Sequence, residues 1–398
     1  MSLPLLSLFL AAFALGTAEF VIAGVLPDVA LGLGISIPTA GMLVTGYAIG
    51  IAAGGPLLAL ATKSMSRKTL IVSLCAIFTV GQALCAIAPN FELLMVARVI
   101  VAVVHGTYFG IAAIVAVNLA PPQQRGFAVA LLLAGLTVSN ILGVPGGTAI
   151  GNALGWRATF WAVGALGLLA TIGMMVFLPA HAGRGMGQGS LASEFRALAR
   201  QQVALSLLIA VLVMVGQYCL FTYIAPLLLQ VTGLARGFVP WVLLLFGVGA
   251  TIGVLIGGRL ADWRLLPSLI TILSLQALMY VAIYLASPNA VALSVVVLAW
   301  GGASFAFGSP LQSRILEWAG DAPNVASTLI PTAFNIGIAI GAALGGGLIK
   351  AGFGYRNLAW VGFVCLLLAA AVAITSAFWE KRARQVPPTL AEPAPAAD

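Results

Sequence analysis

Glu19 is the side chain of this sequence most able to do chemistry, because it lies inside the first long apolar run of a very apolar chain. A charged group at membrane depth costs roughly 2.5 kcal/mol or more, so it is usually paired, turned toward a cavity or protonated. A carboxyl that takes up and releases protons there could couple a proton gradient to another process. The rest of the chain must supply the helices that position it.

Two more ionisable side chains, Arg98 and His105, lie within the fourth apolar run. With a rise of 1.5 Å per helical residue, Glu19 lies about 10 Å and Arg98 about 9 Å from the external ends of their helices. An ion pair between them, direct or through water, is therefore possible. Asp28, which follows Pro27, is either a second proton carrier or a solvated loop carboxylate.

These residues allow several roles. We expect Glu19 to exchange protons as a cavity faces each side of the membrane in turn, with Arg98 helping to set the pKa of the carboxyl. A permanent structural pair with Arg98, or a bond from Glu19 to neighbouring backbone, remains open. His105 could titrate near neutrality or be a satisfied membrane histidine.

The composition predicts a polytopic membrane protein. The 398 residues are 62% hydrophobic and 7% charged, against roughly 25% charged residues in soluble domains. The basic residues are scattered, which argues against a nucleic-acid partner. There is no phosphate-binding Gly-x-x-x-x-Gly-Lys-Ser/Thr loop and no cluster of metal ligands, so we expect no enzyme and no cofactor, with an ion gradient as the energy source.

The sequence has twelve apolar runs that reach the roughly 20 residues needed to span a bilayer. They cover approximately 3–26, 39–61, 69–88, 93–117, 126–149, 157–178, 203–229, 240–260, 268–287, 290–312, 325–349 and 356–379. We expect an all-α membrane protein with six-helix bundles at 1–179 and 203–379, a cytoplasmic linker at 180–202 and a disordered tail at 380–398. The first run lacks a cleavage site and is read as a retained helix.

The basic residues predict the orientation. With the N-terminus inside, thirteen of the eighteen Lys and Arg residues fall on the cytoplasmic side and four outside, with Arg98 in the membrane. By the positive-inside rule both termini are then cytoplasmic.

An internal repeat relates the two halves of the chain. Adding 199 to a position in the first half gives a similar residue in the second, as for Gly50 and Gly249 or Arg157 and Arg356. Six helices per repeat keep both bundles in the same orientation, with a cavity between them, as in transporters. We therefore expect a pseudo-symmetric pair of bundles.

Glycines recur at four-residue spacing, which lets membrane helices approach closely. The four sets are Gly46, Gly50 and Gly54; Gly143, Gly147 and Gly151; Gly249, Gly253 and Gly257; and Gly337, Gly341 and Gly345. Static packing within each bundle would explain them. Because the sets occupy corresponding helices, we predict instead that they form the surface on which the two bundles rock.

Several strings together resemble one transporter family. They are Gly55-Pro56-Leu57-Leu58 with Ser66-Arg67-Lys68, Gly258-Arg259-Leu260-Ala261-Asp262, the embedded Arg98, Gly135 to Gly147 with Pro145, Glu19-Phe20, His105-Gly106, Gly155-Trp156-Arg157 and Phe221-Thr222-Tyr223-Ile224-Ala225-Pro226. Together, and at these places along the twelve apolar runs, they resemble the major facilitator superfamily. The branch they resemble is the bacterial twelve-helix drug:proton antiporter and sugar-efflux branch, of the chloramphenicol or arabinose type.

The resemblance implies gating roles for Arg67, Lys68, Arg259, Asp262, Gly143, Pro145 and Gly147. One position departs from the family pattern, since Lys63 stands where the first loop usually carries an aspartate, whereas Asp262 is kept in the repeat. A lock between the halves built on these carboxylates would be one-sided here.

Polar and aromatic residues at mid-depth are the substrate-binding candidates, namely Tyr47, Tyr108, Asn140, Gln217, Tyr218, Tyr223 and Asn335. Few charges and several aromatic rings suit a neutral or weakly cationic amphiphile.

We therefore expect a proton-coupled antiporter, monomeric in the lipid of a bacterial inner membrane, that exports drug-like compounds or sugars. A facilitator or proton symporter for a small metabolite, or a non-transporting sensor, are the alternatives.

Overall fold

The computed structural model describes residues 2–62, 64–179, 199–319 and 325–385, and within them the chain is helical. Lys63, most of the predicted linker and the end of the tail lie outside these ranges. Twelve helices are long and apolar enough to cross a membrane. α11 begins at Gln201 and α18 continues to Gln385, so the ends of the predicted linker and the beginning of the predicted tail are helical.

The first half of the chain, called the N-terminal half below, contributes six spans. Its elements are α1 (Leu3–Phe20), α2 (Ile22–Leu33), α3 (Ile37–Ile49), η1 (Gly50–Gly54), α4 (Gly55–Ala61), α5 (Arg67–Ile87), α6 (Phe91–Leu119), η2 (Pro122–Gln124), α7 (Arg125–Val138), η3 (Ser139–Gly143), α8 (Val144–Leu154) and α9 (Trp156–Phe177). The second span comprises α3, η1 and α4, and the fifth runs from η2 to α8.

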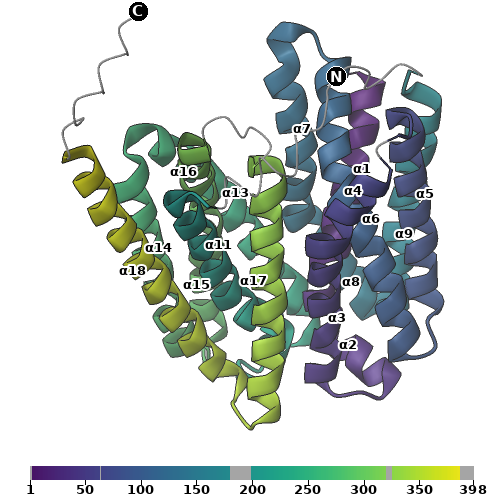
Figure 1. The fold of residues 1–398 in the computed structure, drawn as a ribbon. Helices are drawn as coiled ribbons and strands as arrows, with labels where there is room; N and C mark the ends of the chain where they lie inside the picture. Colours follow the sequence, from purple (N-terminus) through teal and green to yellow (C-terminus); the bar gives the residue numbers. More distant parts are fainter. Residues whose placement is uncertain (1, 63, 180–198, 320–324, 386–398) are drawn as a thin grey trace, which may run out of the picture.

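The C-terminal half contributes the other six spans. Its elements are α11 (Gln201–Phe221), α12 (Ile224–Pro226), η4 (Leu227–Val231), η5 (Arg236–Phe238), α13 (Val239–Trp263), α14 (Leu265–Ala286), α15 (Ala290–Ala306), α16 (Gly308–Ala319), α17 (Val325–Lys350), η6 (Tyr355–Asn357) and α18 (Leu358–Gln385). The two halves stand side by side, and the start of α1 and the end of α18 lie at the same end of the molecule (Figure 1).

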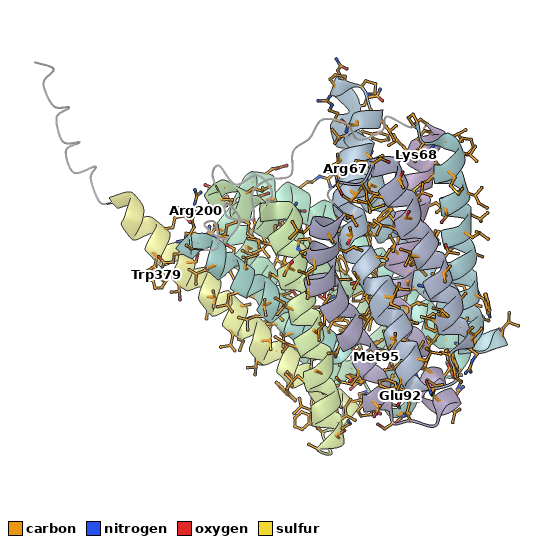
Figure 2. The ribbon with its side chains drawn as sticks, turned by 45° about the vertical axis from the view of Figure 1, so that its right-hand side comes forward. Arg67, Lys68, Glu92, Met95, Arg200 and Trp379 are labelled. Carbon is orange, nitrogen blue, oxygen red and sulfur yellow. The ribbon has the colours of Figure 1, made fainter. Side chains whose placement is uncertain are left out.

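The ends of the molecule can be followed from labelled residues. Arg67 and Lys68 lie at one end of the N-terminal half and Glu92 at the other (Figure 2). Following the predicted orientation, we call the end with Glu92 external. Lys68 extends from the start of α5 to the last turn of α9, where its Nζ donates to the Met175 carbonyl at 3.2 Å and to that of Leu178.

The two halves meet most extensively toward the external end. α3 packs on α17, α13 packs on η3 and α8, and α2 packs on α12. One apolar core runs from α2 and α3 into the C-terminal half, whereas a second core is confined to the N-terminal half. The hydroxyl of Thr45 donates to the Ala339 carbonyl across the boundary at 3.3 Å.

The internal repeat is visible in the packing. Gly50 faces the Val99 carbonyl of α6, and Gly249 faces the Leu298 carbonyl of α15, so both partners are related by the same offset of 199. Arg157 donates to the Ala88 carbonyl at 2.8 Å, and Arg356 donates to that of Tyr284 at 2.7 Å. Each arginine thus ties the last helix of its half to the third.

The predicted role of the glycine sets as a sliding surface is wrong for this conformation. Gly143 meets Thr17 of α1, Gly253 meets Gly302 of α15, and Gly341 meets Val215 of α11, each within its own half. Because a missing side chain lets two backbones approach, these sets pack the bundles internally. Sequence spacing locates such a stripe but does not show which neighbour it faces.

Other glycines and two π-helical turns lie at the boundary between the halves. Gly247 of α13 faces the Asn140 carbonyl, and Gly41 of α3 faces the ring of Tyr223. η1 contacts α17 and η3 contacts α13. Such π-helical insertions in α-helices are frequent at functional sites.

Replacing Gly249 by alanine should destabilise the C-terminal half, because the new Cβ would meet the backbone carbonyl of Leu298 far inside contact distance. We expect a loss of roughly 1–3 kcal/mol, measured as a lower midpoint of thermal unfolding in detergent. Gly258→Ala on the same helix is the matched control, since its Cβ meets nothing within 4 Å. Equal midpoints for the two variants would contradict this packing.

Candidate proton and substrate site

Glu19 lies in the last turn of α1, and α6 of the N-terminal half packs against this helix. Its Oε2 is 3.7 Å from Nε2 of His105, and the two side chains are 13% and 6% exposed, respectively. The other ring nitrogen of His105, Nδ1, lies 3.0 Å from the Tyr47 hydroxyl. Three helices therefore supply a connected row of carboxyl, imidazole and phenol.

Arg98 lies beside this row on α6, one heptad before His105. Its Nη1 donates to the Ala18 carbonyl at 2.7 Å, and its guanidinium stacks over the Tyr47 ring at 4.3 Å. The side chain is 1% exposed, and Nε and Nη2 have no hydrogen-bond partner in the described part of the chain. Two donors of a buried cation are thus directed into the same region as Glu19.

The direct Glu19 to Arg98 contact that the depths allowed is absent in this conformation, where Glu19 faces His105. Helical side chains tilt toward the N-terminus of their own helix. α1 and α6 run in opposite directions, so Glu19 tilts toward the cytoplasmic end and Arg98 toward the external end. Two residues at one depth therefore reach different partners.

A small cavity adjoins Glu19 at the boundary of the two halves. It offers about 10 Å³ to the centre of a water molecule. Its lining comes from α1, α2 and α3 on one side and from α11 and the turn after it on the other, namely Glu19, Phe20, Ile22, Ala23, Val44, Tyr218, Phe221 and Thr222. Of the predicted substrate-binding residues, Tyr218 is the one that lines this cavity.

The other predicted substrate-binding residues are separated from one another. The Tyr108 hydroxyl donates to the Leu8 carbonyl at 3.0 Å, inside the core of the N-terminal half. The Tyr223 hydroxyl donates to the Ala342 carbonyl at 2.9 Å, near the external end. Both rings are fully buried, so in this conformation they are packing residues.

The three predicted amides are buried and only partly satisfied. Asn140 donates to the Leu136 carbonyl at 3.1 Å, and Asn335 to that of Pro331 at 3.0 Å. The acceptor oxygens of Asn335 and Gln217 have no partner among the described residues. These oxygens, both in the C-terminal half, remain available to a ligand that donates hydrogen bonds.

Of the predicted gating residues, Arg67 and Lys68 are half-buried at the start of α5, and the others are either buried or exposed. Gly143, Pro145 and Gly147 are buried in the fifth span, with Gly143 and Gly147 facing α1 and Val21. Arg259 and Asp262 at the end of α13 are exposed. The one-sided lock inferred from Lys63 cannot be placed, because Lys63 lies outside the described residues.

Asp28 is neither a loop residue nor part of the row around Glu19. It lies within α2, beyond the first span, and its Oδ1 is 2.7 Å from Nη1 of Arg236 in the C-terminal half. Asn152 of α8 also donates to the Arg236 carbonyl, at 3.0 Å. Arg236 is one of the four basic residues that the predicted orientation places outside, and in the structure it joins the two halves at the external end.

A buried arginine at the opposite end was also missed. Arg314 of α16 is 1% exposed and donates to Glu380 at 3.0 Å, to Gln202 at 2.9 Å and to Ser376 at 2.8 Å. It ties together α11, α16 and α18, so it is a structural centre of the C-terminal half. In sequence it looked like a loop cation. Within the described residues, no group of three or more His, Cys, Asp or Glu side chains could hold a metal ion.

Comparison with known proteins identifies the family of this twelve-helix, two-half chain. Residues 8–322 match the Major Facilitator Superfamily. The chain belongs to this superfamily. It is 38% identical over 374 residues to the inner membrane transport protein YdhP of Escherichia coli K12, covering 94% of this chain and 96% of that protein.

A second relative supports the assignment, and a solved structure shows the same fold. The chloramphenicol resistance protein of Streptomyces lividans is 34% identical over 375 residues, covering 94% of this chain and 96% of the relative. A bacterial homologue of the human lysosomal transporter Spinster, in an inward-facing and unoccupied conformation, superposes with a TM-score of 0.78 at 20% identity, covering 96% and 98% of the two chains. The chain is thus a multi-pass inner-membrane transporter, and its resemblance to the efflux branch is confirmed.

Arg236→Gln should open the external end, whereas Asp28→Asn should change it little. Burial raises the pKa of the Asp28 carboxyl and the Arg236 guanidinium opposes this, so losing the arginine leaves a desolvated carboxylate unpaired. Losing the carboxylate leaves an arginine that is already 59% exposed. Because an unpaired buried polar group costs about 1–3 kcal/mol, the ratio of closed to open molecules should fall roughly fivefold or more in Arg236→Gln.

Spin labels at Leu31→Cys and Val291→Cys would report this opening, because both positions are more than 70% exposed while the native cysteines are buried. Electron paramagnetic resonance distances should lengthen in Arg236→Gln and return toward wild type in the double variant with Asp28→Asn. Equal effects of the two single variants would refute this explanation.

Proposed function

We propose that this member of the superfamily is a proton-coupled antiporter that exports a neutral or weakly cationic amphiphile by alternating access. The observation that carries the proposal is the Glu19 carboxyl, held within 3.7 Å of the His105 ring beside a cavity lined by both halves. An ionisable group inside a membrane span that faces a cavity is typical of proton pathways.

The row around Glu19 suits proton exchange. Since a carboxylate can only accept hydrogen bonds, a neutral His105 would carry its proton on Nε2, the nitrogen nearest Glu19, and accept from the Tyr47 hydroxyl at Nδ1. Tyr47 would then fix the tautomer of His105, as second partners commonly do for histidine. When Glu19 is protonated it no longer needs a cation, and when it loses the proton the free donors of Arg98 offer it a second partner.

The conformation supports inward access. Contacts, an apolar core and the Asp28 to Arg236 pair join the halves toward the external end. In the proposed cycle, substrate enters from the cytoplasm, Glu19 loses its proton, the external contacts separate, and reprotonation from outside resets the transporter. Substrate and proton bind in turn and never together in this cycle. Such alternate binding is sufficient to exchange one for the other across the membrane.

The buried polar groups of the two halves suit a ligand without strong charge. Glu19 is the acidic side chain within the first span, and the unpaired acceptor oxygens of Gln217 and Asn335 favour a ligand with hydroxyl or amide donors. One relative is named a chloramphenicol resistance protein, and chloramphenicol is a compound of this kind. Drug-like compounds with hydroxyl groups, and sugars, both fit this chemistry.

Glu19→Gln should abolish proton release on ligand binding, because the amide has no proton to exchange. The measurement is the pH change on adding chloramphenicol, and then members of a drug and sugar panel, to purified protein in weakly buffered detergent. Glu92→Gln is the matched control, since Glu92 is an exposed carboxylate in the first turn of α6. Full proton release from the Glu19 variant would disprove the proposed coupling.

Flux in proteoliposomes separates the alternatives. Antiport predicts that an imposed pH gradient drives the ligand uphill in wild-type protein. Flux that ignores the gradient would instead indicate a facilitator, and ligand binding with no flux would indicate a sensor.

A further inference from the structure

The cavity beside Glu19 brings polar groups of both halves together in an otherwise apolar setting. Its N-terminal wall includes Glu19, and its C-terminal wall includes Tyr218 and Thr222. Thr222 follows the last residue of α11 and is fully buried. The space of about 10 Å³ corresponds to a single water molecule.

The Thr222 hydroxyl differs from those of most buried threonines that the structure describes. A threonine in a helix generally donates back to the carbonyl four residues earlier, as Thr17 does to Phe13 at 2.7 Å and Thr251 to Gly247 at 3.0 Å. The buried Thr222 hydroxyl has no hydrogen-bond partner among the described residues. A buried hydroxyl left unpaired costs free energy, so a partner inside the cavity is expected.

We propose that Thr222 is a positioning residue for Glu19, because its hydroxyl and the Glu19 carboxyl share one water molecule in the cavity between the two halves. The role of this water in coupling rests on the proposed function, whereas its binding does not. A buried water needs two to four polar partners, which Glu19 and Thr222 supply, with Tyr218 beside them.

The bridge gives the C-terminal half a direct contact with the proton carrier. Ionised Glu19 would accept a hydrogen bond from the water, and protonated Glu19 would donate one to it, while the hydroxyl can reverse its role accordingly. When the halves separate externally, Thr222 moves away from Glu19 and the bridge breaks. The hydration of the carboxyl, and with it proton affinity, therefore changes with conformation.

Other ionisable groups also surround Glu19 and must be distinguished from Thr222. They are Arg98 and His105 on α6, Tyr47 on α3 and Tyr218 on α11. None is altered by a substitution at Thr222. A change in the vibrational signature of Glu19 after such a substitution would therefore report the water bridge.

The test is infrared difference spectroscopy on the full-length protein, comparing low and high pH, with Glu19→Gln used to assign the carboxyl bands. Thr222→Val keeps the side-chain shape but removes the hydroxyl. We expect its protonated carbonyl stretch to move to higher wavenumber and its titration midpoint to shift, with Thr222→Ser restoring both. Thermal unfolding of each variant checks that the fold is intact.

Thr45→Val is the matched control, because Thr45 also donates a hydroxyl across the boundary, but to the Ala339 carbonyl. Its Glu19 bands should match wild type. Wild-type bands in Thr222→Val, or equal shifts in both variants, would overturn the proposal. If Glu19 shows no titrating band, the proton-carrier role fails, and the carboxylate stretches still decide the bridge by the same comparison.

Discussion

The cost of holding one carboxylate at membrane depth governs the N-terminal half. This cost is roughly 2.5 kcal/mol or more. Two groups near Glu19 offset it: the imidazole of His105, 3.7 Å away, and the buried guanidinium of Arg98, which donates to the carbonyl of Ala18. α3 and α6 are placed so that Tyr47 and His105 continue the row. These partners are few, and two nitrogens of the guanidinium have no hydrogen-bond partner among the described residues.

The two halves share a backbone plan but carry different chemistry. The third and last helices of each half are tied by equivalent arginines, and the close glycine contacts repeat with the same offset. The position that corresponds to Glu19 holds Tyr218, which lines the same cavity. The buried cation of the second half, Arg314, instead binds Glu380, Gln202 and Ser376 in a structural network. Duplication thus provided the frame, and the asymmetric residues provide the site.

The sequence predicted the frame far better than the contacts. Apolar length and the 199-residue repeat yielded the twelve spans and two halves, because the bilayer imposes both on the sequence. The partner of Glu19 was not predictable from depth, since antiparallel helices tilt side chains in opposite directions. The glycine sets were found, but their partners depend on tertiary packing. Arg236 and Arg314 resembled loop cations, because a charge near a span end has the same sequence pattern whether it is solvated or buried.

The π-helical turns η1 and η3 have a consequence for how these spans can be represented. A π turn accommodates an additional residue, and one residue corresponds to about 100° of rotation in a helix with 3.6 residues per turn. The parts of the second span before and after η1, α3 and α4, are therefore out of phase with each other. A helical wheel drawn through the whole span assigns one end to the wrong face, so lipid-facing and boundary positions must be counted separately from each side of the turn.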